Sequence, residues 1–128
     1  MITRSGGLPP KRRRPRFGIG RVPRRIWPRH RAFVKRHACS IRGCRGAPIE
    51  FAHLRTAANS GKDIKPHDWH GISLCREHHR RAHAVGHDTL AQENGMTFEM
   101  LVAIAAEFAR RSPDKTMREA MREMHAAE

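Results

Sequence analysis

The residues of this chain best suited to chemistry are its cysteines and histidines. All three cysteines and seven of the ten histidines lie between positions 39 and 87. They include two short-range pairs, Cys39 with Cys44 and Cys75 with His78. Three thiolates and one imidazole, supplied as two separated pairs, suit tetrahedral Zn²⁺. The spacing therefore predicts a structural zinc site, in preference to a few buried cysteines with surface histidines.

Two further histidines, His79 and His83, follow directly and are four residues apart. In a helix at about 100° per residue they point about 90° away from Cys75 and His78. One short helix can therefore serve two metals on neighbouring faces. We expect this second pair to offer its imidazoles to an open metal site.

The elements that must position these side chains follow from the apolar pattern. Thr97 is expected to cap one amphipathic helix, and Gly86 to end the metal-binding helix before it. We expect the two last helices to pack on the core, with a dimer contact as the alternative. The expected elements are a helix at 29–38, a metal-binding turn at 39–46, a strand at 49–54, a loop at 56–68, and helices at 75–85, 97–111 and around 117–124.

The strong positive charge of the chain indicates which partners it binds. The formal net charge is +14 on 14.7 kDa, with an isoelectric point of about 11.5. Nucleic acid is the expected polyanion, and a membrane is not expected because no long apolar run exists. Residues 1–28 contain no acidic residue and carry a basic block at 11–16. We interpret them as a disordered basic arm, with a solvated tail or a nuclear-localisation signal as alternatives. An odd number of cysteines and no signal-peptide pattern favour a reducing, cytoplasmic compartment.

Three segments together resemble a known family, over roughly residues 36–88. The run Cys75-x2-His78-His79-x3-His83 resembles the final helix of HNH (ββα-metal) endonucleases. The segment 50–55 resembles the strand that carries their first histidine. Residues 65–70, leading into Cys75, resemble a phage-associated subgroup that includes the recombination-enhancement nucleases. The resemblance implies an α+β fold: a small zinc-containing ββα-metal domain at 29–95, between the arm at 1–28 and a helical segment at 96–128.

The resemblance also implies roles for particular residues. His53 matches the general base, which takes a proton from the attacking water. His79 and His83 match the ligands of one catalytic divalent metal, for which Mg²⁺ or Mn²⁺ is the default expectation. Cys39, Cys44, Cys75 and His78 match the structural Zn²⁺ site, with His78 in place of a more usual cysteine.

Two positions depart from the family pattern. Ala52 occupies a position where many members carry a metal ligand, just before the base. His70 occupies the position of the central Asn, so we expect it to hold the loop that bears the base. Asp68 is a possible substitute for either missing function.

The function expected from these observations is metal-dependent hydrolysis of DNA phosphodiester bonds by an HNH endonuclease from a bacterium or a phage. The alternatives are a non-catalytic zinc-containing nucleic-acid-binding module, that is, a degenerate HNH domain, and a basic structural protein. His53, His79 and His83 favour the enzyme, because binding alone requires none of them. The expected DNA contacts are Arg12, Arg13, Arg14 and Arg16 in the arm, Lys62 and Lys65 in the loop, and Arg55, Arg76, Arg80 and Arg81 near the site.

Overall fold

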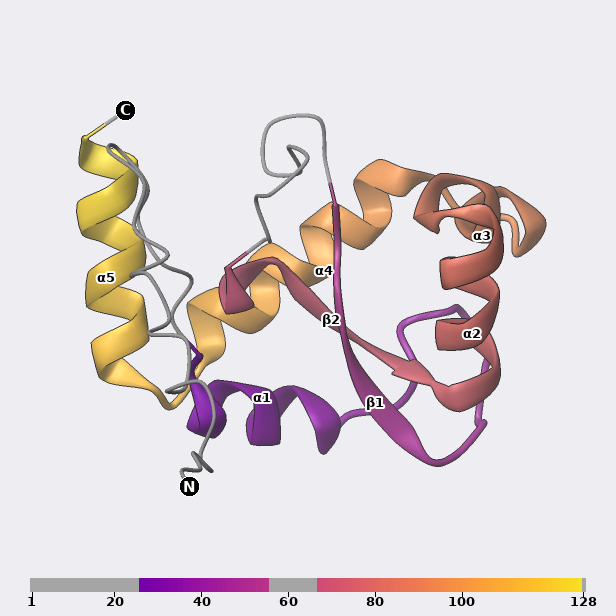
Figure 1. Ribbon diagram of the computed structural model, residues 1–128, viewed down its shortest axis with the longest axis horizontal. Helices are drawn as coiled ribbons and strands as arrows, with labels where there is room; N and C mark the ends of the chain where they lie inside the picture. The colour runs from indigo at the N-terminus through magenta and orange to yellow at the C-terminus, as the bar shows by residue number, and fades with distance from the viewer. Residues whose placement is uncertain (1–25, 56–66, 128) are drawn as a thin grey trace, which may run out of the picture.

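The computed structural model describes residues 26–55 and 67–127 (Figure 1). Within these ranges it is a small mixed α+β fold with two strands and five α-helices, which confirms the expected α+β class. None of the described helices is both long and apolar enough to span a bilayer. The elements are α1 (Pro28–Lys35), β1 (Ile49–His53), the 3-10 helix η1 (Asp68–His70), β2 (Gly71–Cys75), α2 (Arg76–Val85), α3 (His87–Glu93), α4 (Phe98–Arg111) and α5 (Lys115–Ala126).

The two strands form an antiparallel ladder that runs straight into α2. Ile49 is paired with Cys75 at one end, and His53 with Gly71 at the other. Every residue of β2 is buried, because α1, α2 and α4 all pack against that strand. β1 is only partly buried, so its side chains can reach solvent while they are held in register. The hairpin thus places the expected base at one end of β1 and Cys75, one of the expected metal ligands, at the end of β2.

Helix α2 begins and ends where its sequence dictates. The Cys75 sulfur accepts the backbone N–H of His78 at 3.5 Å, which satisfies one of the unpaired donors of the first turn. Gly86 ends the helix with φ +88°, a conformation that favours glycine, and its N–H donates to the carbonyl of Ala82 at 2.8 Å. The helix therefore begins at a cysteine that also belongs to the metal cluster.

Helix α4 joins two apolar cores. The first core contains Ile72 and Leu74 of β2, and α4 adds Leu101 and Ala105 to it. Ala109, one turn further along, belongs to the second core together with Trp27, Trp69 and Met117. Figure 1 shows α4 running behind the hairpin, with α5 at one end and α3 at the other. The expectation that the last helices pack on the core is confirmed.

The structure corrects two boundaries. Residues 87–93 form a helix, α3, that the sequence pattern did not predict, because seven residues are too few for a clear apolar period. The expected arm extends too far, since Trp27 is buried and Pro28 starts α1. An indole buries enough apolar surface to hold these residues on the domain. The rest of the arm, and loop residues 56–66, lie outside the described ranges.

Candidate functional site: a metal cluster and a histidine-lined cleft

Cys39, Cys44, Cys75 and His78 form a cluster whose four ligand atoms all lie within 4.8 Å of one another. The sulfurs of Cys44 and Cys75 are 3.8 Å apart, and Nδ1 of His78 is 3.4 Å and 3.3 Å from the sulfurs of Cys39 and Cys75. Zinc bonds of about 2.3 Å to sulfur and about 2.0 Å to nitrogen place tetrahedral ligands about 3.5–3.8 Å apart. The cluster could therefore hold a metal such as zinc, as the spacing predicted.

Backbone contacts hold the cluster in shape. The Ser73 hydroxyl donates to the carbonyl of Ala38 at 2.7 Å, and the N–H of Ser40 donates to the carbonyl of Ser73 at 2.8 Å. These bonds fix Cys39 against β2. Gly46 passes so close that a Cβ there would lie 2.9 Å from the Cys75 sulfur, so a side chain would crowd the cluster. Burial raises the pKa of Cys39 to about 11, so a bound cation is needed to keep this sulfur a thiolate.

A cleft of about 670 Å³ opens on the neighbouring side of α2. It is bounded by the end of β1, by one face of α2, and by the turn into α3. Three of the histidines singled out in the sequence line it together. The lining residues are Arg31, Phe51, His53, Arg55, His79, Ala82, His83, Gly86 and His87.

His79 and His83 converge in this cleft. Their Nε2 atoms are 3.2 Å apart, whereas two nitrogens bound to one metal at about 2.1 Å stand about 3.0–3.4 Å apart. The Nδ1 of His79 lies 2.9 Å from Oε1 of Glu50, and the other carboxylate oxygen, Oε2, accepts a hydrogen bond from Nε of Arg76 at 3.2 Å. These two hydrogen bonds lower the pKa of Glu50, so its carboxylate is ionised and accepts a hydrogen bond from Nδ1–H of His79. Nε2 of His79 then carries the lone pair, which is the usual arrangement of a metal-binding histidine.

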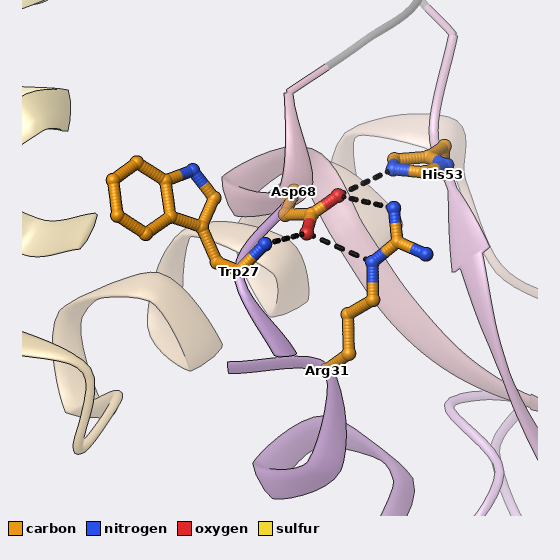
Figure 2. Close-up of polar contacts among 4 residues, drawn as sticks. All are labelled: Trp27, Arg31, His53 and Asp68. Carbon is orange, nitrogen blue, oxygen red and sulfur yellow. Dashed lines mark hydrogen bonds and ion pairs between the residues drawn. The ribbon is translucent and has the colours of Figure 1, made fainter. Parts of the chain in front are cut away.

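The imidazole of His53 is oriented by a hydrogen bond to a buried carboxylate (Figure 2). Its Nε2 lies 2.9 Å from Oδ1 of Asp68, a fully buried residue of η1. Asp68 also accepts two bonds of 2.8 Å from the Arg31 guanidinium and one of 2.7 Å from the backbone N–H of Trp27. Burial by itself raises the pKa of Asp68, but the bonds from His53, Arg31 and Trp27 outweigh it and hold the pKa well below its usual range. Asp68 is therefore a carboxylate that orients His53 through Nε2, leaving Nδ1 as the basic nitrogen.

His87 is a further imidazole in the cleft wall. Burial, together with electrostatic interactions with His79, His83 and Arg55, lowers the pKa of His87 to about 4. The ring is therefore neutral at physiological pH. Because Gly86 ends α2, this histidine belongs to the next helix and not to the face that carries His79 and His83.

The other expected site residues fall into three groups. His70 lies in η1, and its backbone carbonyl accepts the N–H of Leu54 at 2.9 Å, which ties down the chain just after His53. Its side chain lines an apolar pocket beside α4 and not the cleft. Ala52 is buried and offers no ligand. Arg12, Arg13, Arg14, Arg16, Lys62 and Lys65 lie outside the described residues.

The arginines near the site differ in their partners. Arg55 is exposed on the cleft, where it can meet an anion. Arg80 is exposed on α2 and makes no ion pair within the described part of the chain. Arg76 donates to Glu50, and Arg81 forms an ion pair with Glu93, so both are already engaged. Of these four arginines, Arg55 and Arg80 therefore make no ion pair within the described residues, and Arg55 is the one that lines the cleft.

Three residues that contribute to the site were not predicted from the sequence. Glu50 orients His79, Arg31 holds Asp68, and His87 joins the cleft wall. Glu50 was recognisable as the first acidic residue of the chain, three positions before His53. Arg31 gave no signal among so many basic residues, because its partner lies 37 positions away.

Compared with known protein families, curated proteins and solved structures, the chain gives no match.

Proposed function

We propose that this protein is a metal-dependent endonuclease of the HNH kind, which hydrolyses phosphodiester bonds in DNA. One observation carries the proposal: a carboxylate-oriented imidazole, His53, lines the same cleft as the convergent pair His79 and His83. A simple binding module needs neither arrangement. The net charge of +14 supports a polyanionic substrate.

The residues divide into two sets. Cys39, Cys44, Cys75 and His78 would hold a structural Zn²⁺ that contributes folding free energy to the hairpin and α2. His79 and His83 would hold a divalent ion in the cleft. When bound, that ion supplies positive charge to stabilise the phosphate and the leaving oxygen.

The chain's own groups account for the proton transfer. With Nε2–H directed at Asp68, Nδ1 is the nitrogen of His53 that accepts a proton from a water molecule. The water oxygen bonds to phosphorus as the phosphorus–oxygen bond to the leaving sugar oxygen breaks, and that oxygen takes a proton from solvent. His53 becomes an imidazolium facing the ionised Asp68, which stabilises it. Arg55 is placed to contact a phosphate oxygen in the cleft.

The test is cleavage of supercoiled, linear duplex and single-stranded DNA with added divalent metal or with chelator. Cleavage should require the added metal. His53→Ala should lower the rate by about 10²–10⁴-fold while DNA affinity and zinc content stay unchanged, because the base contacts only the attacking water. His125→Ala, an exposed histidine on α5, is the matched control and should cut like the parent.

The competing function is a non-catalytic zinc module that binds nucleic acid, and the buried Ala52 favours it, since the cleft lacks a ligand beside the base. If every substrate stays intact with Mg²⁺, Mn²⁺, Zn²⁺ and Co²⁺ while DNA is still bound, this second function holds. If His53→Ala cleaves DNA at the parent rate, His53 is not the general base.

A further inference from the structure

His87 is the first residue of α3, one residue after the glycine that ends α2. It lines the cleft that also contains His79 and His83. Its Nε2 atom is buried and has no hydrogen-bond partner among the described residues. Among the described residues that line the cleft, His87 is the one with a buried side-chain nitrogen of this kind.

A buried polar nitrogen without a partner costs free energy and calls for an explanation such as a bound ion. Ala52 is buried in the first core and supplies no donor to the cleft. Two imidazoles alone make a sparse protein site, whereas catalytic zinc centres commonly use three protein ligands. The unpartnered nitrogen of His87 therefore belongs to a residue that lines the same cleft as His79 and His83.

We propose that His87 is the third protein ligand of the ion held by His79 and His83. The inference rests on the proposed function, because it concerns the same ion. Among the described residues, no third ligand atom lies within 4.8 Å of both imidazole nitrogens. Binding therefore turns the His87 ring toward the pair, and the open cleft of about 670 Å³ leaves room for that rotation.

A site of three imidazoles also selects its ion. Imidazole nitrogen suits zinc, cobalt, nickel and iron, whereas magnesium is held mainly by carboxylate, carbonyl and water oxygens. No carboxylate is among the described residues that line the cleft, and Glu50 and Asp68 are engaged by His79 and His53. The cleft should therefore bind Co²⁺ or Zn²⁺ in preference to Mg²⁺.

The test starts from full-length protein that already carries one Zn²⁺ per chain. This protein is titrated with Co²⁺, and binding is measured by calorimetry and by the visible absorption of cobalt. The parent should bind one Co²⁺. His87→Gln should weaken that binding by at least about tenfold, because losing even an outer-shell partner of a metal ligand costs about 10–100-fold. His125→Gln is the matched control and should bind like the parent. Zinc content and thermal unfolding of each variant check the fold.

A second measurement avoids any variant that misfolds. In the unaltered protein, the side-chain ¹⁵N resonances of His79, His83 and His87 should shift together when a second equivalent of Zn²⁺ is added. If His79→Ala loses Co²⁺ and His87→Gln keeps the parent affinity, or if the His87 resonance stays in place, the third-ligand inference is overturned and the proposed site survives. If His79→Ala and His83→Ala also keep the parent affinity, the proposed metal site itself fails.

Discussion

Asp68 should be the polar residue on which the stability of the cleft depends most. Asp68→Ala removes the acceptor of the Trp27 N–H, which is buried by the second core; an unsatisfied buried donor costs about 1–3 kcal/mol. It also removes two charge-assisted bonds from Arg31, worth about 1.5–3 kcal/mol. Because the Arg31 side chain is 28% exposed, water can replace part of that loss. We expect a net destabilisation of about 3–5 kcal/mol, as for one broken buried ion pair.

The assay is urea unfolding followed by circular dichroism, with zinc present in excess. A loss of about 3–5 kcal/mol is a large fraction of the roughly 5–15 kcal/mol typical of a folded domain. Glu93→Ala breaks the exposed ion pair with Arg81 and is the matched control, since exposed pairs contribute little. Arg31→Met should also destabilise, and the double variant should cost less than the sum of the two, because each single change leaves the other charge unpaired. A loss below about 1 kcal/mol for Asp68→Ala, or simple additivity with Arg31→Met, would refute the reasoning.

Four further outcomes are expected. Purified protein should contain one tightly bound zinc per chain, and Cys75→Ser should release it and unfold the domain, as metal analysis and circular dichroism would show. Gly71→Ala would place a Cβ 2.0 Å from the ring of Phe51, so urea unfolding should reveal a destabilisation of about 1–3 kcal/mol; an unchanged midpoint would contradict the packing. Burial lowers the pKa of His30 below 6.5, so the unfolded chain binds more protons and stability should fall as the pH drops below about 6.5; His30→Gln should flatten that fall in parallel pH titrations of unfolding. Deleting residues 1–25 removes nine Lys or Arg, so DNA affinity should fall. The slope of log affinity against log salt concentration should become less steep by several units, and an unchanged slope would show that the arm does not contact DNA.

Local pattern was sufficient for several elements. The strand expected at 49–54 is β1 at 49–53, and the helix expected at 75–85 is α2 at 76–85. Thr97 caps α4 as expected, accepting the N–H of Met100 at 3.2 Å. These predictions hold because caps, apolar periods and glycine stops act within a few residues of chain.

The cluster of Cys39, Cys44, Cys75 and His78 was also predictable from the sequence. Cys39 and Cys44 lie in one turn, and Cys75 and His78 in the first turn of one helix, so each pair is set by its own spacing. The composition also indicated these ligands, since the cluster uses every cysteine of the chain. The hairpin between the two pairs brings them together, as the predicted site requires.

The rest of the cleft was decided by tertiary packing. Arg31 reaches Asp68 across 37 residues and His53 reaches it across 15, and no local rule relates such positions. Asp68 could be named from the sequence only as a possible substitute for a missing group. Its role as the acceptor for His53 follows from the burial of η1 between α1 and α4. His87 likewise faces the cleft because Gly86 turns the chain into a second helix. The sequence alone could therefore determine the ligands that one helix or one turn carries. The partners that orient these ligands come from separate elements, and only the packing of those elements fixes which side chains meet.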